Sequence, residues 1–214
     1  MNFFHKCLRL GLPFYMLGAT CYAGGLPHPQ GEVLLSVGTA QQSASHLKDD
    51  LQTQGYSSVQ LQDDKRATSW ALGYRQPLNE RWCVEAQYLD QGKSKPSLAA
   101  TFPAGKTDAQ AAQDIAQARP ERGQGLTVAG VYQQPLGKRW LAQVGGGAFA
   151  WRSKNEATVG NVRYTAKDTG ISPLVQVGLG YKVTPKVTLE TTAQHFFMPH
   201  EDVDRVAVGV AMGF

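Results

Sequence analysis

The chain has little cysteine, no long apolar run and no large excess of one charge. Three of its 214 residues are cysteines. If Cys7 and Cys21 leave with a secretory signal, only Cys83 remains, and one thiol cannot form an internal disulfide. Beyond the N-terminus no stretch approaches the roughly 20 apolar residues of a membrane helix. The mean hydropathy of −0.31 argues against several such helices. It is compatible with strands in which polar and apolar residues alternate.

The balance of charges and of apolar residues excludes further classes. Lysine and arginine number 21, aspartate and glutamate 17, and the formal net charge is +4. Because no basic cluster stands out, we expect no nucleic-acid partner. Apolar residues make up 42% of the chain, so a disordered protein is not the default interpretation. The length suits one sizeable domain.

The N-terminus has the pattern of a secretory signal. Lys6 and Arg9 precede a short apolar run at 10–19, and Cys21-Tyr22-Ala23 places small residues at positions −3 and −1. We therefore expect a signal peptide at 1–23, cleaved after Ala23, and one domain at 24–214. Lipidation of Cys21 is the alternative, although Thr20 is a poor neighbour for a lipid-acceptor cysteine.

A period of two dominates the remaining sequence and predicts eight strands. We place them at Glu32–Gln41, Arg66–Pro77, Glu80–Gln91, Gly123–Gln134, Lys138–Lys154, Gly170–Val183, Lys186–Phe197 and Asp204–Phe214. Each has about the ten residues that a tilted strand needs to cross a bilayer.

The connections between these strands alternate in length. Pro77–Glu80, Pro135–Lys138 and Thr184–Lys186 are tight turns. The other connections are Gln42–Lys65, Gly92–Arg122, Asn155–Thr169 and the shorter Met198–Val203. Short turns at the periplasmic rim and long loops outside are typical of outer-membrane barrels. Within the loops we expect short helices at 45–54 and 111–118, the second preceded by a capping box from Thr107 to Gln110.

One face of most strands is apolar and the other is small or polar. In the last strand Val206, Val208 and Met212 oppose Arg205 and Ala207. A sheet in hydrocarbon must close to pair every backbone group. We therefore predict an all-β protein, an eight-stranded antiparallel transmembrane β-barrel with short periplasmic turns and long extracellular loops. A soluble lipocalin-like barrel, with its apolar face inside, is the structural alternative.

Aromatic residues near the strand ends suggest two interfacial girdles. Those assigned to the short-turn rim are Trp82, Trp140, Tyr181 and Phe214, and those assigned to the loop rim are Trp151, Tyr164 and Phe197.

Two runs resemble a known family. Residues 170–190, GISPLVQVGLGYKVTPKVTLE, resemble the sixth and seventh strands of OmpA-like outer-membrane barrels, and VAVGVAMGF at 206–214 resembles their last strand. The resemblance covers nearly all of the chain after the signal. It implies location in the bacterial outer membrane, contact with its lipid and lipopolysaccharide, and a C-terminal Phe214 that signals to the barrel-assembly machinery. Since the sequence ends at the barrel, we expect no peptidoglycan-binding domain, as in stand-alone barrels of the adhesin, opacity or colonization-factor type.

The inward face of the expected barrel carries the charged residues Arg75, Arg81, Glu85, Lys182 and Glu190. The resemblance implies a buried charge cluster, and charges inside a narrow barrel must pair. We expect Glu85 and Glu190 to pair with Arg75 and Lys182. Structural packing is the expected role, with a narrow gated pore as the alternative.

No residue pattern indicates catalysis, a cofactor or a metal site. Lipid A deacylases, which resemble this architecture, place a serine two residues after a histidine, whereas Phe196 and Phe197 follow His195. His195 with the run His200-Glu201-Asp202 could indicate a metal site, but such residues in a polar outer loop are usually solvated. We expect a non-enzymatic protein whose loops bind a host surface, matrix or envelope components. The alternatives are a lipid-modifying enzyme and a low-conductance channel.

Overall fold

A computed structural model describes residues 31–42, 53, 55–62, 66–92, 97–101, 105–118, 123–159, 161–199 and 202–214. The expected signal peptide at 1–23 lies outside these residues, as does the expected helix at 45–54 apart from Thr53. None of the helical segments in these ranges has the length and hydropathy of a membrane-spanning helix.

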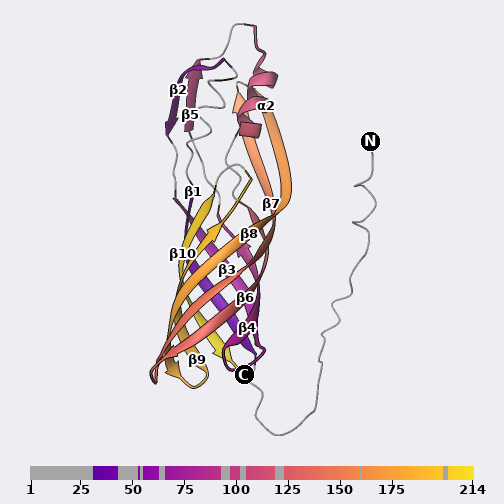
Figure 1. Cartoon of the computed structure of the whole chain (residues 1–214). Coiled ribbons are helices and arrows are strands. Elements are labelled where there is room, and N and C mark those ends of the chain that lie inside the picture. Colours follow the sequence, from indigo (N-terminus) through magenta and orange to yellow (C-terminus); the bar gives the residue numbers. More distant parts are fainter. Residues whose placement is uncertain are drawn as a thin grey trace, which may run out of the picture.

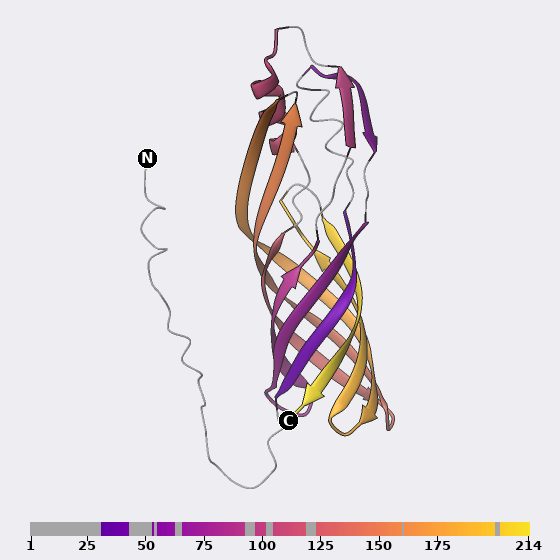
Figure 2. The same cartoon turned by 180° about the vertical axis from the view of Figure 1, so that it is seen from behind.

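Eight antiparallel strands close into a barrel in the order β1-β10-β9-β8-β7-β6-β4-β3 (Figures 1 and 2). Their bounds are β1 Glu32–Gln42, β3 Arg66–Pro77, β4 Trp82–Asp90, β6 Gln124–Leu136, β7 Trp140–Val159, β8 Val162–Thr184, β9 Val187–Phe196 and β10 Val203–Gly213. The first and last strands pair from Glu32↔Gly213 to Gln42↔Val203, so the sheet has no free edge. The predicted fold class is confirmed.

The strands alternate between the barrel interior and its outer surface, as expected from the sequence. On β3, Trp70, Leu72 and Tyr74 are 40–50% exposed, whereas Ala71 and Arg75 are buried. Similar rows of exposed valine and leucine follow β1, β8 and β10, and Leu189 of β9 is exposed as well. So continuous an apolar surface is too large for a water-soluble monomer. The orientation matches a membrane barrel, and the lipocalin-like alternative is wrong.

Tight turns join β3 to β4, β6 to β7 and β8 to β9 at one end of the barrel (Figure 1). In the first, the Asn79 side-chain oxygen accepts the backbone N–H groups of Arg81 and Trp82, which fixes the turn. Gly137 has a φ of 90° in the second, a conformation that favours glycine. We call this end, where Trp82, Trp140 and Phe214 are exposed as predicted, the short-turn rim.

The girdle predicted for the opposite end is partly wrong. Phe197 is exposed there, but Trp151 is 4% exposed and lies inside the barrel. Its indole Nε1 donates to the Ser172 hydroxyl at 2.9 Å. Trp151 belongs to the inward row of β7, and its position near the loop end of the barrel did not reveal which way the side chain points. The exposed aromatic pair on the described part of this end is Trp70 with Tyr88.

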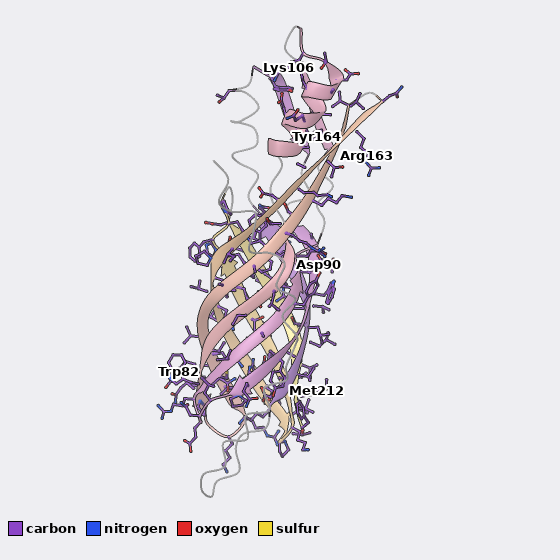
Figure 3. All side chains as sticks on the ribbon, turned by 90° about the vertical axis from the view of Figure 1, so that its right-hand side faces the viewer. Trp82, Asp90, Lys106, Arg163, Tyr164 and Met212 are labelled. Carbon is purple, nitrogen blue, oxygen red and sulfur yellow. The ribbon has the colours of Figure 1, made fainter. Side chains whose placement is uncertain are left out.

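The strands β7 and β8 continue far beyond the barrel as one hairpin (Figures 1 and 2). They stay paired to Val159↔Val162, so the loop expected at 155–169 is wrong. Helix α2 (Asp108–Ala118) packs on this hairpin, and β2 (Ser57–Gln62) pairs with β5 (Ser97–Thr101) beside it. We call the hairpin beyond the barrel, α2, β2 and β5 the outer extension. Figure 3 places Lys106, Arg163 and Tyr164 on it and Trp82 at the opposite end.

The second predicted loop helix is confirmed and begins at Asp108, three residues earlier than expected. Its capping box is formed as the sequence indicates. The Gln110 N–H donates to the Thr107 hydroxyl at 3.3 Å, and the Thr107 N–H donates to the Gln110 side-chain oxygen at 3.1 Å. These bonds satisfy two backbone donors at the start of the helix.

Candidate functional site

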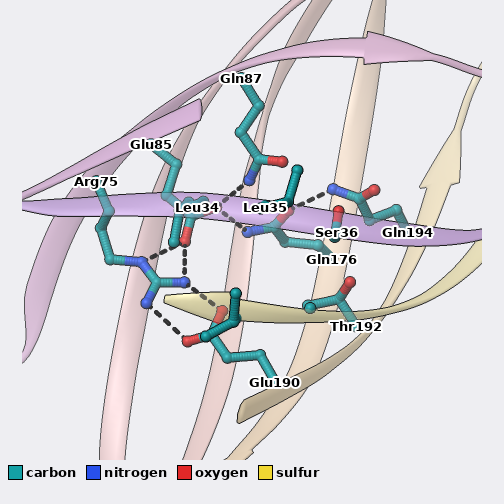
Figure 4. Close-up of a pocket in the computed structure, with 12 residues that line it drawn as sticks. Leu34, Leu35, Ser36, Arg75, Glu85, Gln87, Gln176, Glu190, Thr192 and Gln194 are labelled. Atoms are coloured by element: carbon teal, nitrogen blue, oxygen red, sulfur yellow. Dashed lines mark hydrogen bonds and ion pairs between the residues drawn. The ribbon is translucent and has the colours of Figure 1, made fainter. Parts of the chain in front are cut away.

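Arg75 is the centre of an ionic cluster inside the barrel (Figure 4). Its side chain is buried and bonds three carboxylates. It donates to Glu85 Oε1 at 2.7 Å, to both oxygens of Glu190 at 2.7 and 2.9 Å, and to Glu32 Oε2 at 2.9 Å. The register explains this meeting, because Arg75 pairs with Glu85 on β4 and with Glu32 on β1.

The structure brings Arg75, Glu85 and Glu190 together but leaves Lys182 out. Lys182 is exposed near the β8–β9 turn, and Arg81, also expected on the inward face, is exposed in the β3–β4 turn. Its register partner is Thr188, whereas Glu190 is paired with Gly180, one inward position deeper in the barrel. The prediction that Lys182 joins the cluster is therefore wrong. Glu32, which supplies the third carboxylate, was missed although it begins a predicted strand.

A chain of side-chain amides leads from this cluster to a second buried arginine. Glu85 Oε2 accepts from Gln176 Nε2 at 3.0 Å, Gln176 Oε1 accepts from Gln194 Nε2 at 2.9 Å, and Gln194 Oε1 accepts from Arg205 Nη1 at 2.8 Å. Both amides point their nitrogen toward Glu85 and their oxygen toward Arg205. We call Glu85, Gln176, Gln194 and Arg205 the glutamine relay.

Arg205 is 1% exposed and otherwise donates to the hydroxyls of Ser69 and Ser36, at 3.0 and 2.8 Å. In the part of the chain that the structure describes, no carboxylate contacts it. The aligned amide dipoles of the relay link its positive charge to Glu85. Sequence alternation assigned Arg205 to the inward face but did not reveal this connection.

A small cavity lies inside the barrel beside these residues. It has a volume of about 20 Å³, is lined by relay and cluster residues, and has room for about one water molecule. Toward the outer mouth the interior contains a buried apolar cluster, with the Phe149 and Phe196 rings 5.2 Å apart and Leu89 and Leu174 in the same cluster. The polar side chains of Gln42 and Gln91 are buried at this end as well. This arrangement can hold the strands in register.

The outer extension has an apolar core of its own. Ala111, Ala112, Ile115 and Ala116 of α2 form a buried cluster with Tyr56 and Val159, and Tyr164 packs against it. Tyr164 therefore faces the helix and is not the girdle residue that we expected. The extension is a packed structure, in contrast to the loop expected at 155–169.

Polar contacts at the edge of this core fix the helix further. The Tyr56 hydroxyl donates to Asp114 Oδ2 at 2.9 Å, and Lys106 binds the same carboxylate while lying 4.5 Å above the Tyr56 ring. Burial, followed by the Asp114 hydrogen bond and charge, raises the pKa of Tyr56 above its ordinary value. The hydrogen bond to Asp114 raises the pKa of Lys106.

The outward face of the hairpin is basic. Alternation places Arg152 and Lys154 of β7 on the same face as Arg163 and Lys167 of β8, and all four are exposed. Lys154 and Lys167 are direct cross-strand partners. The four cations give this face a local positive charge, which attracts anionic groups. We call these four residues the basic face.

The histidine considered for catalysis or metal binding lies at the outer mouth. His195 Nδ1 is 2.7 Å from Asp204 Oδ1, and its Nε2 is 3.6 Å from Asp202 Oδ2. His200 and Glu201 lie outside the described residues. Within the ranges given above, no group of three or more His, Cys, Asp or Glu side chains is placed to hold a metal ion.

The closed barrel with an apolar outer surface defines an integral outer-membrane protein. The OmpA-like transmembrane domain matches residues 37–200, and the chain belongs to this family of bacterial outer-membrane barrels. No curated protein sequence matches it.

Solved structures agree in fold. Neisserial surface protein A is 14% identical, with 86% of this chain and 97% of that chain covered and a TM-score of 0.52. The N-terminal β-barrel domain of OprF from Pseudomonas aeruginosa is 10% identical, with 87% and 100% covered and a TM-score of 0.53. At these identities the likeness establishes the barrel alone.

Proposed function

We propose that the protein is a non-enzymatic outer-membrane barrel whose outer extension binds host surfaces, matrix or other envelope components. The basic face carries this proposal. Lys154, Arg163 and Lys167 lie on the packed extension, and Arg152 lies at the adjoining end of the barrel, where it pairs with Gln124. All four are on the loop side, the side that faces outward in barrels of this type. The chemistry favours an anionic polymer, such as a sulfated or phosphorylated glycan, because such a ligand spans several cations at once.

The barrel interior has a structural role in this proposal. Arg75 with its carboxylates and the glutamine relay cross-link strands that are distant around the barrel. Phe214, which is 60% exposed with its ring 6.3 Å from that of Tyr74, is the proposed signal for the barrel-assembly machinery.

A charge-reversal experiment tests the binding role. Cells producing the wild-type protein are compared with cells producing K154E/K167E for adhesion to surfaces coated with a sulfated polysaccharide. We expect the variant to lose most of the adhesion, and to lose less in high salt, where screening already weakens the wild type. K182E/K186E is the matched control, since both lysines are exposed at the short-turn rim. Equal adhesion by K154E/K167E and wild type refutes the proposal, provided that both resist detergent and shift in gel mobility on boiling.

Cells with and without the protein test the lipid-modifying activity, and the purified protein in planar bilayers tests the channel activity. We expect an unchanged lipid A mass spectrum with and without the protein, and no conductance in planar bilayers. A shortened lipid A would support the lipid-modifying enzyme, and regular current steps would support the channel.

A further inference from the structure

Two of the three short turns carry the same sequence pattern. Residues 74–82 read YRQPLNERW and residues 132–140 read YQQPLGKRW. Tyr, Gln, Pro, Leu, Arg and Trp recur at identical spacing, although a tight turn requires only its proline and a residue such as asparagine or glycine. The recurrence of the Arg-Trp pair therefore needs another explanation.

The two turns also make the same contacts. Arg81 Nη1 donates to the Tyr132 hydroxyl at 3.1 Å, and Arg139 Nη1 donates to the Tyr181 hydroxyl at 2.9 Å. Trp82 meets the Tyr132 ring edge-on at 5.3 Å, and Trp140 meets the Tyr181 ring in the same way at 5.0 Å. In both cases the tyrosine is the register partner of the tryptophan on the following strand. We call each Arg-Trp-Tyr set a rim clamp.

Each rim clamp presents a fixed cation beside exposed apolar groups. Both arginines are exposed, and Trp82 and Trp140 are 49% and 48% exposed. Leu78 and Leu136, at the same place in the two turns, are exposed as well. The tyrosine hydroxyl engages one N–H of a guanidinium that carries five, so most of the donors stay available. An arginine oriented in this way can bind a phosphate through two parallel hydrogen bonds.

We propose that each rim clamp binds the phosphate of one phospholipid in the periplasmic leaflet. The two sites differ in charge beside the arginine, where the first turn has Glu80 and the second has Lys138. The short-turn rim borders the apolar outer surface, so an acyl chain can lie on the tryptophan and leucine while its headgroup meets the arginine. Indole rings favour this headgroup level, and the cation complements the phosphate. The third turn, Thr184–Lys186, has no Arg-Trp pair and supplies no third site.

Native mass spectrometry of the protein extracted in mild detergent can count the retained phospholipids. We expect up to two on the wild type, one on R81Q, one on R139Q and none on R81Q/R139Q. K186Q, which removes an exposed cation at the third turn, keeps both. Detergent resistance and the boiling shift verify that every variant is folded.

Two results overturn the proposal. One is a double variant R81Q/R139Q that retains as many phospholipids as the wild type. The other is a K186Q variant that loses as many phospholipids as R81Q or R139Q does, because that would indicate a general attraction of the lipid to basic residues. Excess inorganic phosphate separates the two possible sources of the phosphate group. Retention of the phospholipids in its presence identifies the whole lipid as the occupant, whereas a wild-type protein that carries phosphate adducts but no phospholipid refutes the lipid.

Discussion

Substitution of Glu85 by glutamine tests the ionic interior, because it removes a charge with little change of shape. Among the described residues, Glu85 Oε1 accepts only from Arg75, and Oε2 accepts only from the side-chain amides of Gln87 and Gln176. Whichever position the new amide nitrogen occupies, it faces donors. The glutamine at position 85 therefore leaves buried donors without an acceptor.

Reorientation of the neighbouring amides cannot remove this conflict. If Gln176 turns its oxygen toward residue 85, its nitrogen meets the nitrogen of Gln194. If Gln194 turns as well, its nitrogen meets Arg205, which is always a donor. Each buried donor left unsatisfied costs about 1–3 kcal/mol. Since Arg75 keeps Glu190 and Glu32, we expect E85Q to lower the free energy of unfolding by about 2–4 kcal/mol.

The relay also predicts coupling between two residues that do not touch. In E85Q/R205M both amides can reverse, because no guanidinium remains at the far end. The double variant should therefore be more stable than the sum of the single effects indicates, by about 1 kcal/mol. E190Q/R205M is the matched control. Glu190 accepts from Arg75 and Gln143 and is not part of the relay, so this pair should be additive.

Denaturant titration in lipid vesicles, followed by the gel mobility of unboiled samples, measures these differences. A stability of E85Q within about 0.5 kcal/mol of the wild type would show that the cluster does not stabilise the barrel. Additive effects in E85Q/R205M, with the E85Q loss intact, would refute coupling through the glutamines.

Two further predictions concern the outer extension and the barrel wall. I115D places a carboxylate in the apolar core between α2 and the hairpin, so trypsin should cleave after Lys106 severalfold faster while the unfolding midpoint of the barrel is unchanged. Q113D, at an exposed position of the same helix, is the control, and equal cleavage of both variants contradicts the packing. The Cys83 thiol is 2% exposed, so a maleimide should label it only after unfolding, and labelling of the folded protein would place it on the outer surface.

The barrel was predictable because apolar residues alternate with small or polar residues along the strands, and this alternation distinguishes the outward side from the inward side. β3 has the predicted bounds, Arg66–Pro77, since its outward apolar row is continuous from end to end. The β7–β8 hairpin was missed for a related reason. Beyond the barrel the outward side chains of the same strands become charged, as at Lys154 and Lys167, and the segment resembles a loop. Its inward row, with Val159 and Tyr164, keeps the period of two.

For the interior site, the sequence predicted which side of its strand each charged residue faces, but not its position along the barrel axis. Parity placed Arg75, Glu85, Glu190 and Lys182 on the inward side of their strands. Whether two inward residues meet depends on the stagger between strands, which sequence does not reveal. The register brings Glu32 to Arg75 and leaves Lys182 near the turn. The pairing of β2 with β5 joins the connection between β1 and β3 to the connection between β4 and β6, and no local sequence pattern predicts it.

The seam between β1 and β10 has a consequence for biogenesis. Its two strands stand at opposite ends of the barrel sequence, so the last hydrogen-bonded ladder cannot form before β10 has been synthesised. Until then both strands present open edges, which invite mispairing with other chains. Closure of the barrel must therefore follow synthesis of β10, and until then the two open edges have to be kept from pairing with other chains.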